Sequence, residues 1–198
     1  MKKMLQKIII VTGVCLSSTA WSGEPIVSSS EIDNYHGYIG VGYNHPFIGI
    51  TDYKQTESDG ILLVFGHNYR PWLDLELRAS TATGYKKVNS KTSGQPDLSV
   101  RQNYNVAGLF KFKWQPVRML EFSLDTGLNY MDYEKKIGTV SSNEYKTGLV
   151  LGAGVGLHIT KTFSINADYQ SYQRDTFLKT DTTDNTWSAA NLSFQYHF

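Results

Sequence analysis

Long apolar runs, cysteine and excess charge are all scarce in this chain. Beyond residue 20 no apolar stretch approaches the about 18 residues that a membrane-spanning helix needs, which excludes a helical membrane protein. The formal net charge is +1 over 198 residues, so there is no electrostatic reason to expect a nucleic-acid partner. The single cysteine, Cys15, lies close to the start of the chain.

The first 22 residues have the pattern of a cleaved secretory signal peptide. Three lysines and no acid occupy the first seven positions, Ile8–Leu16 is a short apolar run, and small residues follow. We expect cleavage after Ser22; cleavage after Ala20 and an uncleaved N-terminal anchor are the alternatives. Removal of this segment takes Cys15 with it, leaving neither a disulfide nor a cysteine-based metal site.

The remainder is rich in aromatic residues and glycine, with 13 Tyr, 9 Phe, 4 Trp and 17 Gly. Apolar and polar residues alternate in eight segments that begin near residues 35, 61, 73, 104, 120, 145, 163 and 191. Such period-two alternation predicts strands with one apolar and one polar face. The facing of residues 61–65 is undecided, because both of its faces are apolar. The segments run to about 9–15 residues, longer than the ~5–6 typical of soluble strands and suited to a membrane.

The connections between these segments alternate in length. Short turns are expected at 70–72, 115–119 and 160–162, and long polar segments near 45–59, 82–101, 132–143 and 173–185. A sheet in hydrocarbon must close on itself to pair every backbone group. We therefore predict an all-β fold: an eight-stranded antiparallel up-and-down transmembrane β-barrel with three short periplasmic turns and four long extracellular loops. The expected boundaries are 1–22 for the signal peptide, 23–34 for an N-terminal periplasmic segment and 35–198 for the barrel.

The polar face of each strand is predicted to fill the narrow barrel interior, while the apolar face meets lipid. Charges of both signs lie on neighbouring strands, so we expect a lumen charge network that neutralises itself. Its predicted members are Asp74, Glu76, Arg78, Lys111, Lys113, Glu121, Asp125, Lys146 and Asp168, with His158 on the same face. Gly152, Gly154 and Gly156 lie on one face of a continuous strand, which favours room for long lumen neighbours over a nucleotide-binding turn.

Aromatic residues gather near the predicted strand ends, as in the interfacial girdles of membrane barrels. The candidates are Tyr35, Tyr43, Tyr69, Trp72, Trp114, Tyr130, Tyr145, Tyr169 and Phe198. Within the second long loop a group of basic residues is a candidate contact for lipopolysaccharide or another anionic surface, although a solvated loop explains it equally well. This group comprises Lys86, Lys87, Lys91 and Arg101. The five histidines form no recognisable ligand pair, and we expect neither a metal nor a cofactor.

Four stretches resemble a known family. Asn191–Phe198 is similar to the C-terminal strand of bacterial outer-membrane barrels. Tyr38–Tyr43, Tyr69–Leu77 and Gly152–Tyr169 resemble parts of the OmpA-like and OmpX/Ail-like eight-stranded proteins. The resemblance implies an outer-membrane location and an assembly signal at Phe194, Tyr196 and Phe198. It implies contact with the barrel assembly machinery, outer-membrane lipid and lipopolysaccharide, a host or surface ligand bound through the loops, and a monomer. The implied role is non-enzymatic: envelope integrity, adhesion or resistance.

Three other functions stay open from the residues. A lipid A-modifying enzyme would need a serine, a histidine and an acid near the membrane interface, and His158 with Ser164 or His197 with Ser193 are candidate pairs. A narrow small-solute pore is a variant of the barrel. A soluble lipocalin-like carrier is disfavoured, because the charged face containing Asp74 would have to point to water.

Overall fold

The structure is a computed structural model that describes residues 36–49, 53–90, 97–174 and 186–198. The predicted signal peptide, 1–22, and the predicted periplasmic segment, 23–34, lie outside the described residues. None of the described residues belongs to a helix long and apolar enough to cross a membrane.

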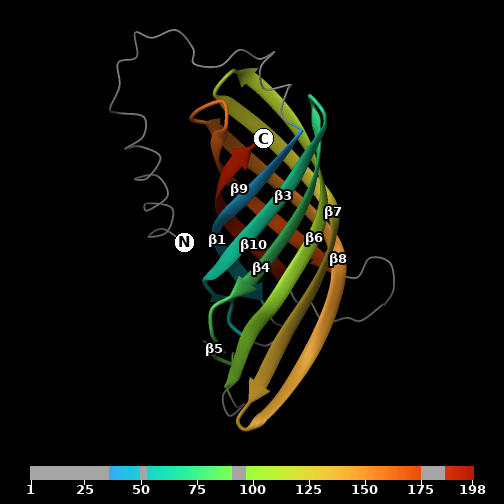
Figure 1. Cartoon of the computed structure of the whole chain (residues 1–198). Coiled ribbons are helices and arrows are strands. Elements are labelled where there is room, and N and C mark those ends of the chain that lie inside the picture. The colour runs from blue at the N-terminus through green and yellow to red at the C-terminus, as the bar shows by residue number, and fades with distance from the viewer. Residues whose placement is uncertain (1–35, 50–52, 91–96, 175–185) are drawn as a thin grey trace.

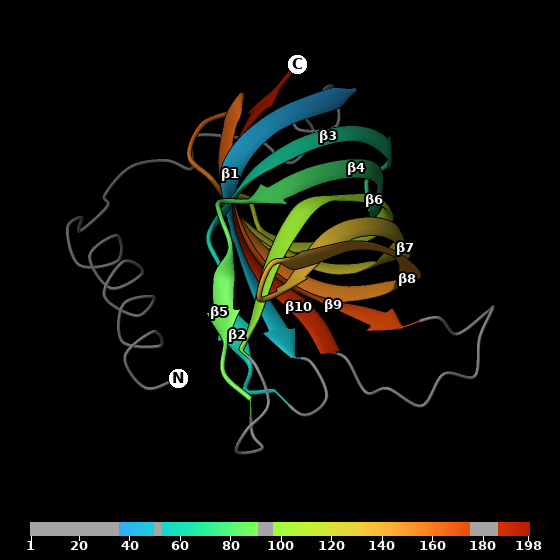
Figure 2. The ribbon, with the colours of Figure 1, turned by 90° about the horizontal axis from the view of Figure 1, so that it is seen from below.

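The described chain forms one antiparallel sheet that closes into a barrel (Figures 1 and 2). Strand β1 pairs with β3 on one side and with the last strand on the other, from Tyr38 opposite His197 to Gly49 opposite Thr186. Eight long strands make the wall, and two short strands, β2 and β5, lie at one end. Their bounds are β1 Gly37–Gly49, β2 Thr56–Glu57, β3 Gly60–Arg70, β4 Leu73–Ala82, β5 Lys86–Val88, β6 Leu98–Val117, β7 Leu120–Ile137, β8 Val140–His158, β9 Phe163–Arg174 and β10 Thr186–His197. The predicted eight-stranded antiparallel barrel is confirmed.

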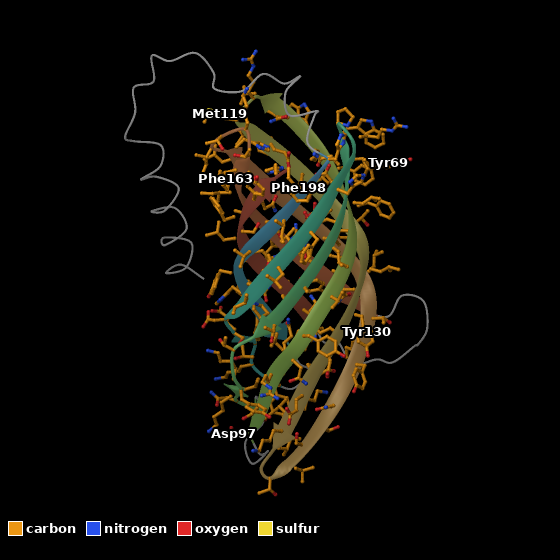
Figure 3. All side chains as sticks on the ribbon, in the orientation of Figure 1. Tyr69, Asp97, Met119, Tyr130, Phe163 and Phe198 are labelled. Carbon is orange, nitrogen blue, oxygen red and sulfur yellow. The ribbon has the colours of Figure 1, made fainter. Side chains whose placement is uncertain are left out.

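The three predicted short turns all lie at one end of the barrel, called here the turn end. They connect β3 to β4, β6 to β7 and β8 to β9. Met119, Phe163 and Phe198 mark this end in Figure 3, and Asp97 marks the opposite, loop end. The backbone N–H groups of His36 and Gly37 donate to the carbonyl of Phe198, so the first and last described residues meet at the turn end.

The prediction of a long loop at 132–143 is wrong. Strands β7 and β8 continue through this segment in unbroken register to Ile137 opposite Val140. Only Gly138 and Thr139 form the turn, and the positive φ of 59° at Gly138 favours glycine there. The two strands extend past the apolar belt, where both faces can be polar, so the alternation that identifies a strand disappears while the backbone pairing continues.

Side chains in the wall alternate between lipid and lumen as the periodicity predicts. On β4, Leu75 and Leu77 are exposed while Asp74, Glu76 and Arg78 are buried. On β3 the undecided facing is settled by the structure. Ile61, Leu63 and Phe65 point outward, whereas Leu62 and Val64 are buried in the lumen beside Tyr38.

Two rows of exposed aromatic rings border the apolar belt. At the turn end Trp72 stacks on Phe112 with centroids 6.2 Å apart, and Trp114 on Phe122 at 5.7 Å. Toward the loop end, rings of three neighbouring strands stack at 6.1 and 6.0 Å. These are Tyr104, Tyr130 and Tyr145. The predicted girdle residues in the described chain are all exposed, and Tyr35 lies outside it.

Beyond the belt at the loop end, β6, β7 and β8 project as a sheet with its own apolar core, called here the extension (Figure 1). The short strand β5 pairs with β6 through Lys86–Val88 and lies along this sheet. The buried core residues come from five strands: Ile48, Val88, Leu98, Val100, Met131, Tyr133 and Trp187. Among the described residues, packed apolar side chains therefore occupy the loop end of the interior.

Candidate functional site

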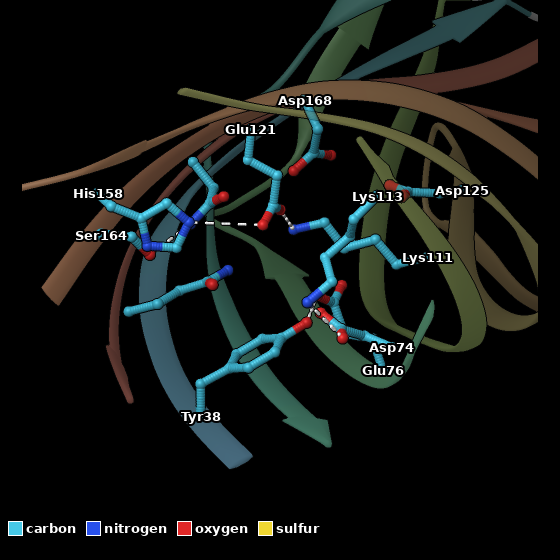
Figure 4. A network of polar contacts seen from close by, with 12 residues as sticks. Tyr38, Asp74, Glu76, Lys111, Lys113, Glu121, Asp125, His158, Ser164 and Asp168 are labelled. Carbon is cyan, nitrogen blue, oxygen red and sulfur yellow. Dashed lines mark hydrogen bonds and ion pairs between the residues drawn. The ribbon is translucent and has the colours of Figure 1, made fainter. Parts of the chain in front are cut away.

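Arg78 is the centre of the charged lumen, and the three carboxylates that it contacts, Glu76, Asp125 and Asp168, are labelled in Figure 4. Its guanidinium forms an ion pair with Glu76 on the same strand. It also contacts Asp168 of β9 at 2.6 Å and Asp125 of β7 at 3.6 Å. All four side chains are almost completely buried. One planar cation with several donors thus lies within ion-pair distance of three carboxylates from three strands.

Two further ion pairs lie in the same region. Lys111 Nζ is 3.0 Å from Glu121 Oε1, and Lys113 Nζ is 2.7 Å from Asp74 Oδ1. His158 Nε2 lies 3.4 Å from Glu121 Oε2. The structure therefore brings together eight of the nine predicted network residues, each within reach of an opposite charge. Such buried charges tolerate the low dielectric only when they are paired.

Lys146, predicted as the ninth member, lies elsewhere. Because β8 is long, Lys146 belongs to the extension, opposite Met131. Its Nζ stands over the Tyr133 ring, 5.3 Å from the centroid. Lys146 lies on the polar face of β8, as predicted, but it is closer to the loop end than the charge network is.

The lumen glycines of β8 lie against long polar neighbours. A Cβ built on Gly154 would stand 2.9 Å from Cβ of Asp168, the residue opposite it on β9. Glycine at this position therefore leaves space for the carboxylate that reaches Arg78, as the sequence suggested.

A serine and a histidine meet in the lumen, in a pairing that the sequence did not predict. Ser164 Oγ lies 2.9 Å from Nε2 of His197 and accepts a hydrogen bond from Asn166 Nδ2 at 3.0 Å. Glu121 contacts the neighbouring His158, whose ring centroid lies 5.5 Å from that of His197. The pair is buried inside the barrel, so it does not face the lipid where a lipid A substrate would lie.

The predicted anionic contact at the loop end is only partly described, because Lys91 lies outside the described residues. The other three members each have a carboxylate close by. Lys86 Nζ is 3.7 Å from Asp59, Lys87 Nζ is 2.6 Å from Asp97, and Arg101 Nη2 is 2.9 Å from Glu134. This surface carries interleaved charges and is not a uniform basic patch.

Arg101 also lies over the Tyr85 ring, 4.6 Å from the centroid. Glu134 accepts hydrogen bonds from Ser141 and from the Tyr85 hydroxyl. These hydrogen bonds, together with the Arg101 charge, lower the pKa of Glu134. The contacts tie the chain before β5 to the outer face of the extension.

The residues of the expected assembly signal lie on the lipid face of β10. Phe194, Tyr196 and Phe198 are exposed, and the rings of Phe194 and Tyr196 each lie 5.3 Å from that of Phe163. Their strand completes the barrel against β1.

Sequence reasoning missed Tyr38 and the apolar core of the extension. The Tyr38 hydroxyl donates to Glu76 Oε2 at 2.6 Å inside the network. Its position on the polar face of β1 was the available signal. The core of the extension gave none, because most of its members lie in segments that the sequence predicts as loops. Among the described residues no group of three or more His, Cys, Asp or Glu side chains is placed to hold a metal ion.

A closed antiparallel barrel with an apolar outside, a charged inside and aromatic rows at both borders defines a transmembrane β-barrel. The chain belongs to the outer membrane protein beta-barrel domain family, whose model matches residues 12–198. No curated protein sequence matches it.

Several solved structures share the fold. Neisserial surface protein A (NspA) matches with a TM-score of 0.61 at 12% identity, covering 82% of this chain and 97% of that one. Ail, the attachment invasion locus protein of Yersinia pestis, matches with a TM-score of 0.58 at 18% identity, covering 83% and 99%. The N-terminal β-barrel domain of Pseudomonas aeruginosa OprF gives 0.55 at 13% identity, covering 82% and 99%. At such identities the likeness shows the fold alone.

Proposed function

We propose that this outer-membrane barrel is a non-enzymatic surface-interaction protein of the adhesion or resistance type, and that the extension is its contact surface. The observation that supports this proposal is the packed apolar core at the loop end, whose members include Ile48 and Trp187. A barrel does not need this core to be stable in lipid, because the charge network already fills the lumen between the membrane-spanning strands. The core instead packs β6 and β7 of the extension against β1, β5 and β10.

One edge of the extension supports this role. Within the described chain Val140–Thr147 pair with β7 alone, since the pairing of β8 with β9 begins at Gly148. An edge strand offers backbone donors and acceptors to an extended segment of another protein. Another crystal structure of Ail contains the heparin analogue sucrose octasulfate, which makes immobilised heparin a useful probe. Lys86, Lys87, Lys91 and Arg101 are the proposed contacts for heparin or lipopolysaccharide, whose anionic groups would replace the carboxylates that now pair with Lys86, Lys87 and Arg101.

The test shortens the hairpin without disturbing the barrel. Residues 135–142 begin and end at paired positions, Lys135 opposite Ser142, so Glu134 and Asn143 can be joined through Asn-Gly. The matched control replaces only Gly138-Thr139 by Asn-Gly. Bacteria lacking other adhesins should adhere to epithelial cells or to heparin when they express the parent or the control, and lose that adherence with the short hairpin. Equal adherence of all three, with each protein heat-modifiable on gels, would exclude the role.

The proposed orientation places the loop end outside the cell and the turn end in the periplasm. We also propose that the signal peptide directs export, that the barrel assembly machinery inserts the chain, and that the barrel is a monomer. Removal of Cys15 with the signal leaves a chain without thiols, which allows single-cysteine labelling. A membrane-impermeant maleimide should label Thr139→Cys on intact cells and should not label Lys161→Cys. The reverse labelling pattern would contradict the orientation.

A further inference from the structure

The lipid-facing belt has a groove on its outer surface. This groove, of about 640 Å³, crosses β3, β4, β6 and β7. Exposed apolar side chains line it: Phe65, Leu75, Leu77, Phe110 and Leu128. Gly108 points outward at its floor, and a Cβ built there would meet nothing within 4 Å. The volume lies within the range of small-molecule sites, roughly 300–1,000 Å³. Its lining and its place in the belt suit a hydrocarbon chain.

A basic rim borders the groove on the side of the turn end. His67 lines the groove and is exposed on the outward face of β3, two residues from Phe65. Three residues further along, Arg70 begins the turn, with its guanidinium 5.4 Å from the centroid of the exposed Tyr69 ring. An imidazole and a guanidinium thus follow an apolar groove toward the membrane interface, where a phosphate would lie.

The three connections at the turn end have the same sign of charge. At each of them there is one basic residue, Arg70, Arg118 or Lys161, and residues 70–72, 115–119 and 159–162 contain no Asp or Glu. At the loop end, by contrast, Lys86, Lys87 and Arg101 all have carboxylate neighbours. Anionic headgroups are therefore favoured at the turn end.

We propose that the groove over Gly108 binds one acyl chain of an anionic phospholipid, whose phosphate contacts Arg70 and His67. The assignment of this lipid to the periplasmic leaflet rests on the orientation proposed above. The groove orders a lipid that would otherwise exchange freely along the wall, so the protein retains it after extraction from the membrane.

Native mass spectrometry of the refolded full-length barrel, incubated with phosphatidylglycerol or with phosphatidylcholine of the same chains, tests the site. The parent should retain one phosphatidylglycerol in preference to phosphatidylcholine. Gly108→Leu fills the groove and should lower retention of both lipids by about tenfold, since several buried methylene contacts are lost. Ala153→Leu, an outward position on β8, is the matched control and should retain lipid like the parent.

Arg70→Gln should remove the preference for phosphatidylglycerol and leave phosphatidylcholine retention unchanged, whereas Arg118→Gln, in a different turn, should change neither. Equal retention by Gly108→Leu and Ala153→Leu, or a parent without preference between the two lipids, would overturn the proposal. Heat-modifiability on gels confirms that each variant is folded. A wrong orientation would appear in the cysteine labelling and leave these measurements unaffected, so the two failures are distinguishable.

Discussion

The ring of Tyr38 lies directly against the backbone of Gly66, its partner across β1 and β3. A Cβ built on Gly66 would stand 2.0 Å from Cζ of the ring, far inside van der Waals contact. Only glycine therefore lets the ring lie flat in the lumen, from where the Tyr38 hydroxyl reaches Glu76. A residue without a side chain thereby positions a hydrogen-bond donor for the charge network.

Gly66→Ala should destabilise the barrel by about 1–3 kcal/mol, the usual effect of overpacking. The added methyl group forces Tyr38 away from Glu76. Gly108→Ala is the matched control, since its methyl group meets nothing within 4 Å, and it should be close to neutral. Urea unfolding in lipid vesicles, followed by tryptophan fluorescence, measures both. Identical midpoints for the two variants would contradict the role assigned to Gly66.

Arg78→Met should cost about 3–5 kcal/mol, because it leaves buried carboxylates without their shared cation. Three acids depend on Arg78, as the ion pairs with Glu76, Asp125 and Asp168 show. Lys87→Met removes an ion pair of similar distance, Lys87 to Asp97, from an exposed surface, and should change stability by about 0–1 kcal/mol. The same unfolding measurement compares them, and a loss for Arg78→Met as small as that for Lys87→Met would refute a coupled network.

Phe198→Ala should lower the amount of folded barrel in the outer membrane without a comparable loss of stability after refolding in vitro. The expected cause is the loss of the terminal aromatic residue from the proposed assembly signal. Phe122→Ala also removes an exposed ring at the turn end, where Phe122 stacks on Trp114, and should assemble normally. Quantification of the heat-modifiable band in membrane fractions separates the two. Equal yields would argue against the signal.

The Ser164–His197 pair should be structural and not catalytic, because both side chains are buried inside the barrel, away from the lipid where a lipid A substrate would lie. Cells that overexpress the protein should have the same lipid A acylation pattern as cells that express Ser164→Ala, as measured by mass spectrometry. A new acylated or deacylated species that depends on Ser164 would establish the enzymatic alternative.

The purified barrel should show no discrete conductance steps in a planar bilayer. Packed apolar side chains, including Tyr133 and Trp187, fill the loop end, and ion pairs around Arg78 fill the region near the turn end. Steps of uniform size from the parent protein would support a small-solute pore. Refolding confirmed by gel mobility is needed before either result is interpreted.

Alternation in the sequence was sufficient to predict the membrane wall. Leu75 and Leu77 face lipid and Glu76 faces the lumen because hydrocarbon on one side and a crowded interior on the other impose opposite requirements on neighbouring residues. The network members on β4, β6 and β7 follow from the same rule.

The alternation rule does not apply outside the hydrocarbon. The paired residues Lys135 and Ser142 are both polar, so the sequence of their strands resembles that of a loop. For the same reason the core containing Val100 and Met131 was not predicted. A shift of register between Gln102 and Tyr104 also changes which face of β6 points inward. Val100 is buried and so is Asn105, although the two differ by an odd number of residues. Local patterns do not position such an irregularity.

The length of the β7–β8 hairpin has a kinetic consequence. Its tip lies at the end of the barrel opposite to Phe198 and the start of β1 (Figure 1). A chain that inserts while its ends stay on one side must carry Glu134, Lys135, Lys136 and Glu144 through hydrocarbon. Moving charged side chains into an apolar medium is expensive unless they are paired. Lys135 Nζ lies 2.7 Å from Glu144 Oε1 on the neighbouring strand, and this ion pair neutralises two of the four charges. Passage of this hairpin therefore adds to the free-energy barrier that the inserting chain must cross.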